Sequence, residues 1–321
     1  MAAGGVGVSE RLLYIGVTTP VYRDGPPAQQ FASEQVSYCF VPMKTKLGNT
    51  DLQVSRLGFG AARIDALPEE QVAVLLHRVL DDGINLIDTA DCYPASEERI
   101  GRILADRRDQ YVLATKCGCL TEHVQGEAFS RAVIEAGVEL SLQRLGTDHV
   151  DLLQLHSCSE EILREGDAVD ALLRARDDGR TRFIGYSGDE ENALAAIELG
   201  VFDTLQITFN LIDQLALERV LPAARQAGLG VIAKRPIANA RLLEAGGDHD
   251  YAGEYWARVR EQPDAPTDAI ELSLRFIAFH EFVDVGIVGT ANVDHLQQNV
   301  ARWQKGPLSS TLVDSINRSV N

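Results

Sequence analysis

The sequence predicts a (β/α)8 TIM barrel built from parallel strands. Beyond residue 43, short apolar runs alternate with stretches of helical periodicity, and this rhythm is typical of parallel strands joined by crossover helices. Eight such runs favour a closed barrel over an open sheet. The runs end near Gly60, Asp88, Lys116, His156, Ser187, Gln206, Lys234 and Val288.

Two stretches between these runs predict helices by the spacing of their apolar residues. In residues 69–82 and again in residues 131–145, the apolar side chains fall on one face of a helix. Gly83 follows the first stretch and Gly146 the second, where glycine is a common stop signal. Both stretches therefore predict crossover helices that bury one face against the barrel.

Two later helices are predicted from their end signals. In residues 189–200, Asp189 is expected to cap the N-terminus and Gly200 to end the helix. The next helix is expected to begin at Asp213 and to end at Gly228. With these, the alternation of strand and helix continues through the second half of the chain.

An open doubly wound sheet is the main competing fold. Its signature is a G-x-G-x-x-G turn between a strand and a helix, where the backbone approaches a pyrophosphate. Only Gly58-Phe59-Gly60 approaches this signature, and Arg63 occupies the third glycine position. We therefore interpret these glycines as part of a tightly packed strand near the barrel entrance.

The chain divides at Met43. Residues 1–42 contain Gly, Pro, Ser and Gln without clear periodicity, so we expect a poorly ordered N-terminal extension. Our hypothesis is that translation naturally starts at Met43 and that residues 1–42 are an addition to the natural protein. Residues 43–321 are expected to form a single barrel domain.

The longest interval between predicted strand ends falls late in the barrel. It contains residues 235–266, which predict a loop with one helical piece over the barrel mouth. Loops on that face shape the pocket of such barrels, so we expect this loop and the segment after Val300 to do so here. Tyr255 and Trp256 either line the pocket or pack the loop onto the barrel.

Charge and cysteine content exclude several classes of protein. The net charge of −17 over 321 residues would repel a nucleic-acid backbone or an anionic membrane surface. Five cysteines, an odd number in a chain of this length, argue against a disulfide framework and favour a reducing compartment. No apolar run reaches the length of a membrane span, and no signal peptide is recognisable. We expect a cytoplasmic protein that binds neither nucleic acid nor membranes.

Four polar side chains stand near the predicted strand ends. Asp88, Lys116 and His156 each follow an apolar run, and Tyr93 lies five residues after Asp88. Each one alone is more simply explained by capping, rim or core packing. Together they suggest a site, because a lysine beside an apolar strand needs a partner charge, which Asp88 supplies. The C-terminal ends of the strands form the active face of this fold.

These segments resemble the aldo-keto reductase family from about Lys46 to Val300. The family's opening hairpin, at the barrel bottom, and its first strand correspond to LGNTDLQVSRLGFG. The strands that carry its site residues correspond to IDTADCY, LATK and LLQLH. Its later cofactor segments correspond to FIGYS, LQITFN, VIAKRPIAN and IVGTANVDHLQQNV, in the same order.

The resemblance implies hydride transfer between a nicotinamide cofactor and a small carbonyl or alcohol. Tyr93 would be the general acid that protonates the carbonyl oxygen during reduction. A nearby cation lowers the pKa of a phenol, so Lys116 is expected to lower that of Tyr93 while Asp88 holds the ammonium group. His156 would orient the carbonyl by a hydrogen bond. Positioned proton transfer of this kind typically contributes about 10²–10⁴-fold.

The resemblance also implies the cofactor contacts. Ser187 and Gln206 would contact the nicotinamide carboxamide, although Gly188 stands where the family commonly has Asn. Arg235 replaces the aromatic residue that often stacks under the nicotinamide ring, which a guanidinium plane can also do. The implied cofactor-binding residues are Ser187, Gln206, Lys234, Arg235, Pro236, Gly289, Thr290, Asn292, His295, Gln298 and Asn299.

The resemblance leaves the choice between NADP(H) and NAD(H) to one helix start. Thr290 and Asn292 would lie at a helix N-terminus, a natural anion site for the adenosine phosphate. His295 occupies the position where the family often has Arg, and a neutral His holds a 2′-phosphate less well. Gln298 and Asn299 would contact the adenine. We favour NADP(H), with NAD(H) as the alternative.

Two other functions stay open at this point. One is a cofactor-binding regulatory module with little turnover, against which the complete set of four site residues argues. The other is a metal-dependent hydrolase that uses His156 with Cys92, Cys117, Cys119 and Cys158. Cys117-x-Cys119 lacks the usual spacer of structural zinc sites, so we expect no metal. The sequence therefore predicts an NAD(P)H-dependent enzyme that reduces aldehydes or ketones, or runs the reverse reaction.

Overall fold

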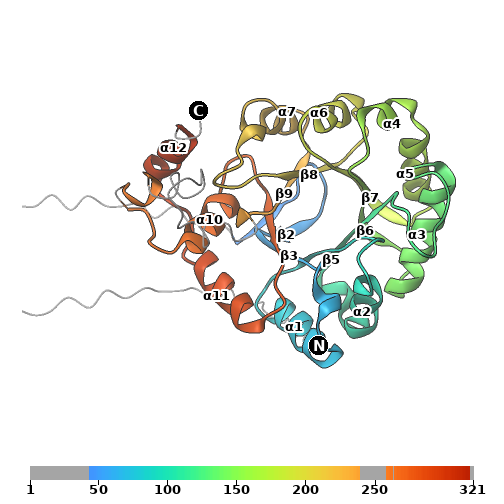
Figure 1. The fold of residues 1–321 in the computed structure, drawn as a ribbon, viewed down its shortest axis with the longest axis horizontal. Helices are drawn as coiled ribbons and strands as arrows, with labels where there is room; N and C mark the ends of the chain where they lie inside the picture. The colour runs from blue at the N-terminus through green and yellow to red at the C-terminus, as the bar shows by residue number, and fades with distance from the viewer. Residues whose placement is uncertain (1–42, 239–257, 263, 319–321) are drawn as a thin grey trace, which may run out of the picture. The chain divides into compact units, whose positions relative to one another are not determined.

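The computed structural model describes residues 43–238, 258–262 and 264–318, in which eight parallel strands close into a barrel surrounded by helices (Figure 1). The predicted fold is confirmed. Around the barrel the strands follow the order β10-β3-β4-β5-β6-β7-β8-β9. Their bounds are β3 Leu57–Gly60, β4 Leu86–Asp88, β5 Val112–Cys117, β6 Val150–His156, β7 Thr181–Ser187, β8 Thr204–Thr208, β9 Gly230–Lys234 and β10 Val285–Val288.

Helices surround this barrel on its outside (Figure 1). In α1, the apolar face is made by Val72, Leu75, Leu76 and Val79, all fully buried, as the 3.6-residue period predicts. The described α-helices are α1 Glu69–Asp81, α2 Ser96–Ile103, α3 Arg131–Leu145, α4 Glu160–Glu165, α5 Asp167–Asp177, α6 Glu190–Leu199, α7 Val220–Gln226, α10 Ala269–Ala278, α11 Val293–Trp303 and α12 Ser310–Arg318. The expected helices at 69–82 and 131–145 are thereby confirmed.

Of the two later helices, α6 begins and ends where expected, between Asp189 and Gly200, whereas the other begins later than expected. Asp189 precedes α6, but its carboxylate does not cap that helix; it accepts hydrogen bonds from the N–H and hydroxyl of Thr208 instead. The helix expected from Asp213 begins only at Val220, after a 3-10 turn. The Asn210 side chain accepts the N–H of Asp213, and this local turn competes with helix formation.

A short antiparallel hairpin closes the bottom of the barrel, as the family resemblance implies. Its strands are β1 Lys44–Lys46 and β2 Gln53–Ser55. Leu47, Leu52 and Val54 are buried there against inward-facing apolar residues of β4, β5, β6, β9 and β10. The barrel interior is therefore a packed core. A second, larger apolar cluster fills the layer between strands and helices.

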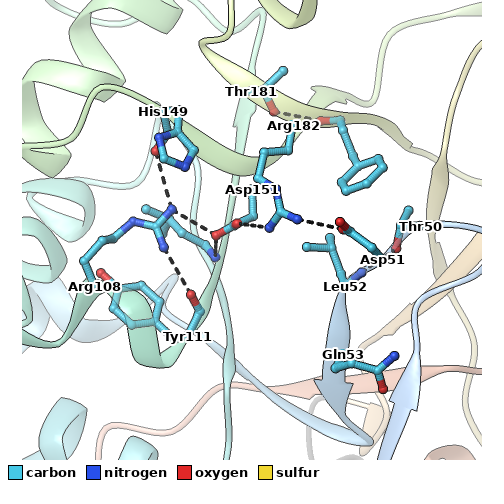
Figure 2. Close-up of polar contacts among 12 residues, drawn as sticks. Thr50, Asp51, Leu52, Gln53, Arg108, Tyr111, His149, Asp151, Thr181 and Arg182 are labelled. Carbon is cyan, nitrogen blue, oxygen red and sulfur yellow. Dashed lines mark hydrogen bonds and ion pairs between the residues drawn. The ribbon is translucent and has the colours of Figure 1, made fainter.

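An ion-pair network centred on Asp151 links β5, β6, β7 and the hairpin loop at the bottom of the barrel, which we call the floor (Figure 2). One carboxylate oxygen accepts the Leu113 N–H and the Arg108 guanidinium, both at 2.9 Å. The other accepts Arg182 at 2.8 Å, and Arg182 also reaches Asp51 in the hairpin loop at 2.7 Å. Burial alone raises the pKa of Asp151, but these donors outweigh it and hold that pKa below its ordinary value.

Some expectations concern residues outside the described ranges. These are the N-terminal extension of residues 1–42, most of the loop at residues 235–266, and the two aromatic residues Tyr255 and Trp256. The glycine interpretation is testable and holds. Gly58 lies in β3, where an added Cβ would come within 2.9 Å of the Ile287 side chain.

Candidate active site

The strand ends bring the predicted site residues together around one cavity at the barrel mouth. The register pairs Lys116 with Gln154 across β5 and β6, and His156 with Ser187 across β6 and β7. The cavity has a volume of about 470 Å³. It is lined by all four predicted catalytic residues and six predicted cofactor residues: Asp88, Tyr93, Lys116, His156, Ser187, Gln206, Lys234, Arg235, Pro236 and Gly289.

A buried ion pair forms the base of this cavity. The Lys116 ammonium lies 2.7 Å from Asp88 Oδ2 and donates to the Thr89 carbonyl oxygen, also at 2.7 Å. The two side chains are 2% and 4% exposed. Burial lowers the pKa of Lys116, but Asp88 and Tyr93 outweigh it and raise that pKa above its ordinary value. Lys116 is therefore held as a cation at the base of the site.

Tyr93 lies over this cation in the loop after β4. The Lys116 Nζ lies 5.2 Å from the centroid of the phenol ring, and the His156 ring meets it edge-on at 5.9 Å. Burial raises the pKa of Tyr93 and outweighs the opposing effect of Lys116, so the net shift is upward. This corrects the expectation of a lowered pKa, which left desolvation out. The phenol stays protonated and able to donate.

His156 has two of the four cysteines of the hydrolase alternative as neighbours. Its Nδ1 lies 3.5 Å from the Cys92 thiol and 3.4 Å from the Cys119 thiol. The hydrogen bond from Cys119, followed by contacts to His156, lowers the pKa of Cys92. The other two cysteines face the core, where Cys117 donates to the Gln154 carbonyl and Cys158 is 1% exposed. The structure thus separates the four cysteines into two pairs.

Asp91 is a buried residue of the site that the sequence argument missed. It is 3% exposed, and neither carboxylate oxygen has a hydrogen-bond partner of ordinary geometry among the described residues. Burial raises its pKa to about 8. The only signal for it was its place beside Cys92 in the loop that carries Tyr93.

The inner cavity wall offers free polar atoms. The Gln206 side chain is 2% exposed and its Oε1 has no partner in the described chain. Ser187 lies beside it, paired in register across β7 and β8. The packing around position 188 explains why a glycine stands there. An added Cβ would lie 2.4 Å from the Tyr186 hydroxyl, which donates to the Cys158 carbonyl. Tyr186 fills the space that an Asn side chain would need.

The outer cavity wall carries the two cations of the Lys234-Arg235 pair. Lys234 lies 3.2 Å from Asp189, and burial lowers its pKa. Arg235 is exposed and has a positive φ of 58°, a backbone conformation that non-glycine residues rarely adopt. Its guanidinium borders both this cavity and a neighbouring acidic one. The structure therefore places Arg235 at the rim.

The remaining predicted cofactor residues do not line this cavity. Asn292 caps α11, and its side chain accepts the N–H groups of Asp294 and His295. Thr290 accepts the N–H of Asn292. His295 is exposed, as is Gln298, whereas Asn299 is buried. Thr290, Asn292 and His295 thus lie at the start of α11, and Gln298 and Asn299 lie further along it.

The chain is similar to known oxidoreductases over most of its length. It matches the model of the Aldo/keto reductase family over residues 56–321. L-galactose dehydrogenase from Arabidopsis thaliana is 28% identical over 278 residues, covering 79% of this chain and 86% of that protein. The uncharacterised oxidoreductase YqkF from Bacillus subtilis is 27% identical over 277 residues, covering 80% and 90%. The holo form of aldo-keto reductase AKR11C1 from Bacillus halodurans superimposes with a TM-score of 0.77 at 28% identity, covering 87% and 96%.

The protein belongs to the aldo/keto reductase family. It is therefore an oxidoreductase of a family that generally uses NAD(P)H on carbonyl compounds. Membership in this family argues against the alternative of a metal-dependent hydrolase. Within the described ranges, no helix combines the length and apolar character needed to cross a membrane.

Proposed function

We propose that this protein reduces small aldehydes or ketones with NADPH, or oxidises the corresponding alcohols, with Tyr93 as the proton donor. The observation that carries this proposal is the buried Asp88–Lys116 pair under Tyr93, with His156 beside the phenol ring. Asp88, Lys116 and His156 stand at the ends of the consecutive strands β4, β5 and β6. Tyr93 follows in the loop after β4, and all four residues line one cavity. Family membership supplies the reaction class, and this geometry supports the assignment of roles.

Each residue has a distinct task in the proposed reduction. The bound nicotinamide supplies the hydride. Tyr93 gives its hydroxyl proton to the substrate oxygen, and its raised pKa keeps that proton in place until then. Lys116 then stabilises the phenolate, because the developing negative charge lies near a buried cation. Asp88 keeps that cation in position, and His156 orients the substrate oxygen.

The inner cavity wall fits a nicotinamide carboxamide. An amide N–H would satisfy the unpartnered Oε1 of Gln206, and the Ser187 hydroxyl lies on the neighbouring strand. Lys234, Arg235 and Pro236 border the same space and would hold the ring and the adjoining phosphates. No Asn side chain assists at position 188, so Ser187 and Gln206 would bear this contact alone.

The start of α11 would bind the adenosine end of the cofactor. Thr290 and Asn292 shape that helix terminus, and Gln298 and Asn299 would face the adenine. Gly289, just before it, lines the cavity. We favour NADPH because a helix N-terminus attracts an anion. His295→Arg should then raise the preference for NADPH over NADH, since Arg binds phosphate more strongly than neutral His. An unchanged ratio would show that the 2′-phosphate is held elsewhere or is not used.

The decisive experiment compares the parent with Tyr93→Phe. Consumption of NADPH and NADH is followed with a reactive aromatic aldehyde, and cofactor binding is measured separately by fluorescence quenching. We expect turnover by the parent and a loss of about 10²–10⁴-fold in the variant, with cofactor binding retained. A parent that binds cofactor but turns over no carbonyl in a panel would instead favour the regulatory module.

A further inference from the structure

We propose that Cys92, Cys119, His156 and Asp91 form a binding site for one zinc-class divalent cation at the edge of the active site. The donor atoms of these four residues all lie within 4.8 Å of one another. They come from three separate places: the loop after β4, the loop after β5, and the end of β6. The fold therefore assembles a Cys₂HisAsp set that no local sequence spacing reveals.

The distances agree with tetrahedral coordination. Zinc lies about 2.3 Å from a thiolate and about 2.0–2.1 Å from an imidazole nitrogen, so two such donors on a tetrahedral ion stand roughly 3.6 Å apart. The Nδ1 of His156 lies 3.5 Å from the Cys92 sulfur and 3.4 Å from the Cys119 sulfur. Both sulfurs are thus already at the separation from Nδ1 that a bound ion requires.

Asp91 provides the independent observation that points to a ligand. A carboxylate that is 3% exposed normally accepts several hydrogen bonds, yet in the described chain neither oxygen of Asp91 has a partner of ordinary geometry. Its carboxyl group interacts with the backbone N–H and the thiol of Cys92. The Asp91 backbone is held firmly, because its carbonyl accepts Arg144 at 2.9 Å. The side chain is therefore positioned, and its oxygens keep acceptor capacity for a ligand.

The local backbone explains which cysteines take part. Gly118, with a φ of 105°, separates Cys117 from Cys119, and an added Cβ there would come within 2.3 Å of the Phe129 ring. This turn directs Cys117 into the core and leaves Cys119 at the mouth. Cys92, Cys119 and His156 are each half-buried, so a cation can reach them from solvent. The short Cys117-x-Cys119 spacing does not matter, because only one of its cysteines is a ligand.

A cation on Nδ1 of His156 also has a consequence for catalysis, which rests on the function proposed above. Nδ1 can then carry no proton, so the neutral imidazole must carry its proton on Nε2. That nitrogen remains as the hydrogen-bond donor to the substrate oxygen. The cation would thereby fix the tautomer that orients a carbonyl.

The test uses Co²⁺ as a spectroscopic probe on the full chain, reduced and stripped of metal. We expect one Co²⁺ per chain, visible bands of tetrahedral coordination, and a thiolate-to-metal charge-transfer band. Zn²⁺ should displace it. Cys92→Ser and Cys119→Ser should each weaken binding by about tenfold or more, since even the loss of an outer-shell partner costs about 10- to 100-fold. Each substitution should also diminish the charge-transfer band.

Cys158→Ala is the matched control, because it removes a cysteine that lies outside the cluster, and it should bind Co²⁺ like the parent. A parent that binds no Co²⁺, or serine variants that bind it unchanged, would overturn the proposal. A disulfide between Cys92 and Cys119 that the reductant does not open, and that blocks Co²⁺ binding, would also overturn it. The titration contains neither cofactor nor substrate, so its result is independent of whether the reductase assignment holds.

Discussion

Asp151 at the floor and Asp91 at the mouth are both buried carboxylates, 5% and 3% exposed, in the same barrel. Asp151 accepts two guanidinium groups and a backbone N–H, so burial is overcompensated and its pKa falls (Figure 2). Asp91 has no guanidinium partner, and burial outweighs its backbone contact with Cys92, so its pKa rises. The Asp151 carboxylate at the floor is fully paired, whereas Asp91 and Gln206 at the mouth keep oxygens without a partner of ordinary geometry in the described chain. In (β/α)8 barrels generally, the bottom face contributes to stability and the C-terminal ends of the strands carry the active site.

The largest expected effect comes from breaking the buried Asp88–Lys116 ion pair at the mouth. Lys116→Met leaves Asp88 buried without its cation, so we expect the free energy of unfolding to fall by about 3–5 kcal/mol. Turnover should fall by about 10²-fold or more, since Tyr93 loses its electrostatic partner. Urea denaturation and initial rates measure the two effects. Lys116 would then serve both stability and catalysis.

Two companion variants sharpen this result. Lys305→Met removes an exposed lysine from a pair with Glu271 and should change stability by less than about 1 kcal/mol. The double variant Asp88→Asn/Lys116→Met should regain part of the lost stability but none of the turnover. Normal stability together with normal turnover in Lys116→Met would contradict the assigned role.

The next effect is a pH dependence on the floor side, where His280 lies in the turn before β10. It is 3% exposed and packs among the rings of Phe209, Phe276 and Phe282. Burial lowers its pKa from 6.5 to about 4. The unfolded chain therefore takes up a proton below pH 6.5 that the folded chain refuses until about pH 4. Stability should fall by about 3 kcal/mol across that window as the pH decreases.

Denaturation midpoints between pH 7 and pH 4 measure this slope. His280→Phe cannot take up the proton, so its stability should decline less steeply than that of the parent over the same range. Parallel slopes for the two proteins would show that other groups account for the acid sensitivity.

A smaller effect isolates the floor network. Asp151→Asn loses the charge-assisted hydrogen bonds to Arg108 and Arg182, and we expect a loss of about 2 kcal/mol in the free energy of unfolding. Turnover should stay unchanged, because the network lies at the opposite end of the barrel from the cavity. Asp51→Asn, at a side chain that is 71% exposed, should cost less than about 1 kcal/mol. A drop in turnover for Asp151→Asn at full folding would undo the separation of the two ends.

The fold was predictable because its main signal is repetitive. Six of the eight predicted strand ends coincide with the observed ones, and β5 and β8 run only one and two residues further. The errors lie where polar side chains have competing partners. Asp189 is the type of residue that caps helices, yet Thr208 and Lys234 use its carboxylate. No local pattern distinguishes these outcomes, because the competing groups come from other strands.

The candidate site was predictable only in part, for the same reason. Asp88, Lys116 and His156 end strands, so the fold alone brings them to one face. Asp91 follows no strand-end rule, and its lack of partners is a property of the folded loop. The pKa of Tyr93 depends on how deeply the phenol is buried, which sequence spacing does not give.

The smallest expected change tests the mouth against the floor directly. In metal-free protein, Asp91→Asn removes a buried carboxylate that receives no hydrogen bond of ordinary geometry, so stability should change by less than about 1 kcal/mol. The same substitution at Asp151 should cost about twice that or more. Urea denaturation of both variants with a chelator present makes the comparison. An equal loss at Asp91 would mean that this carboxylate has a structural partner, and the mouth would then be built on the same principle as the floor.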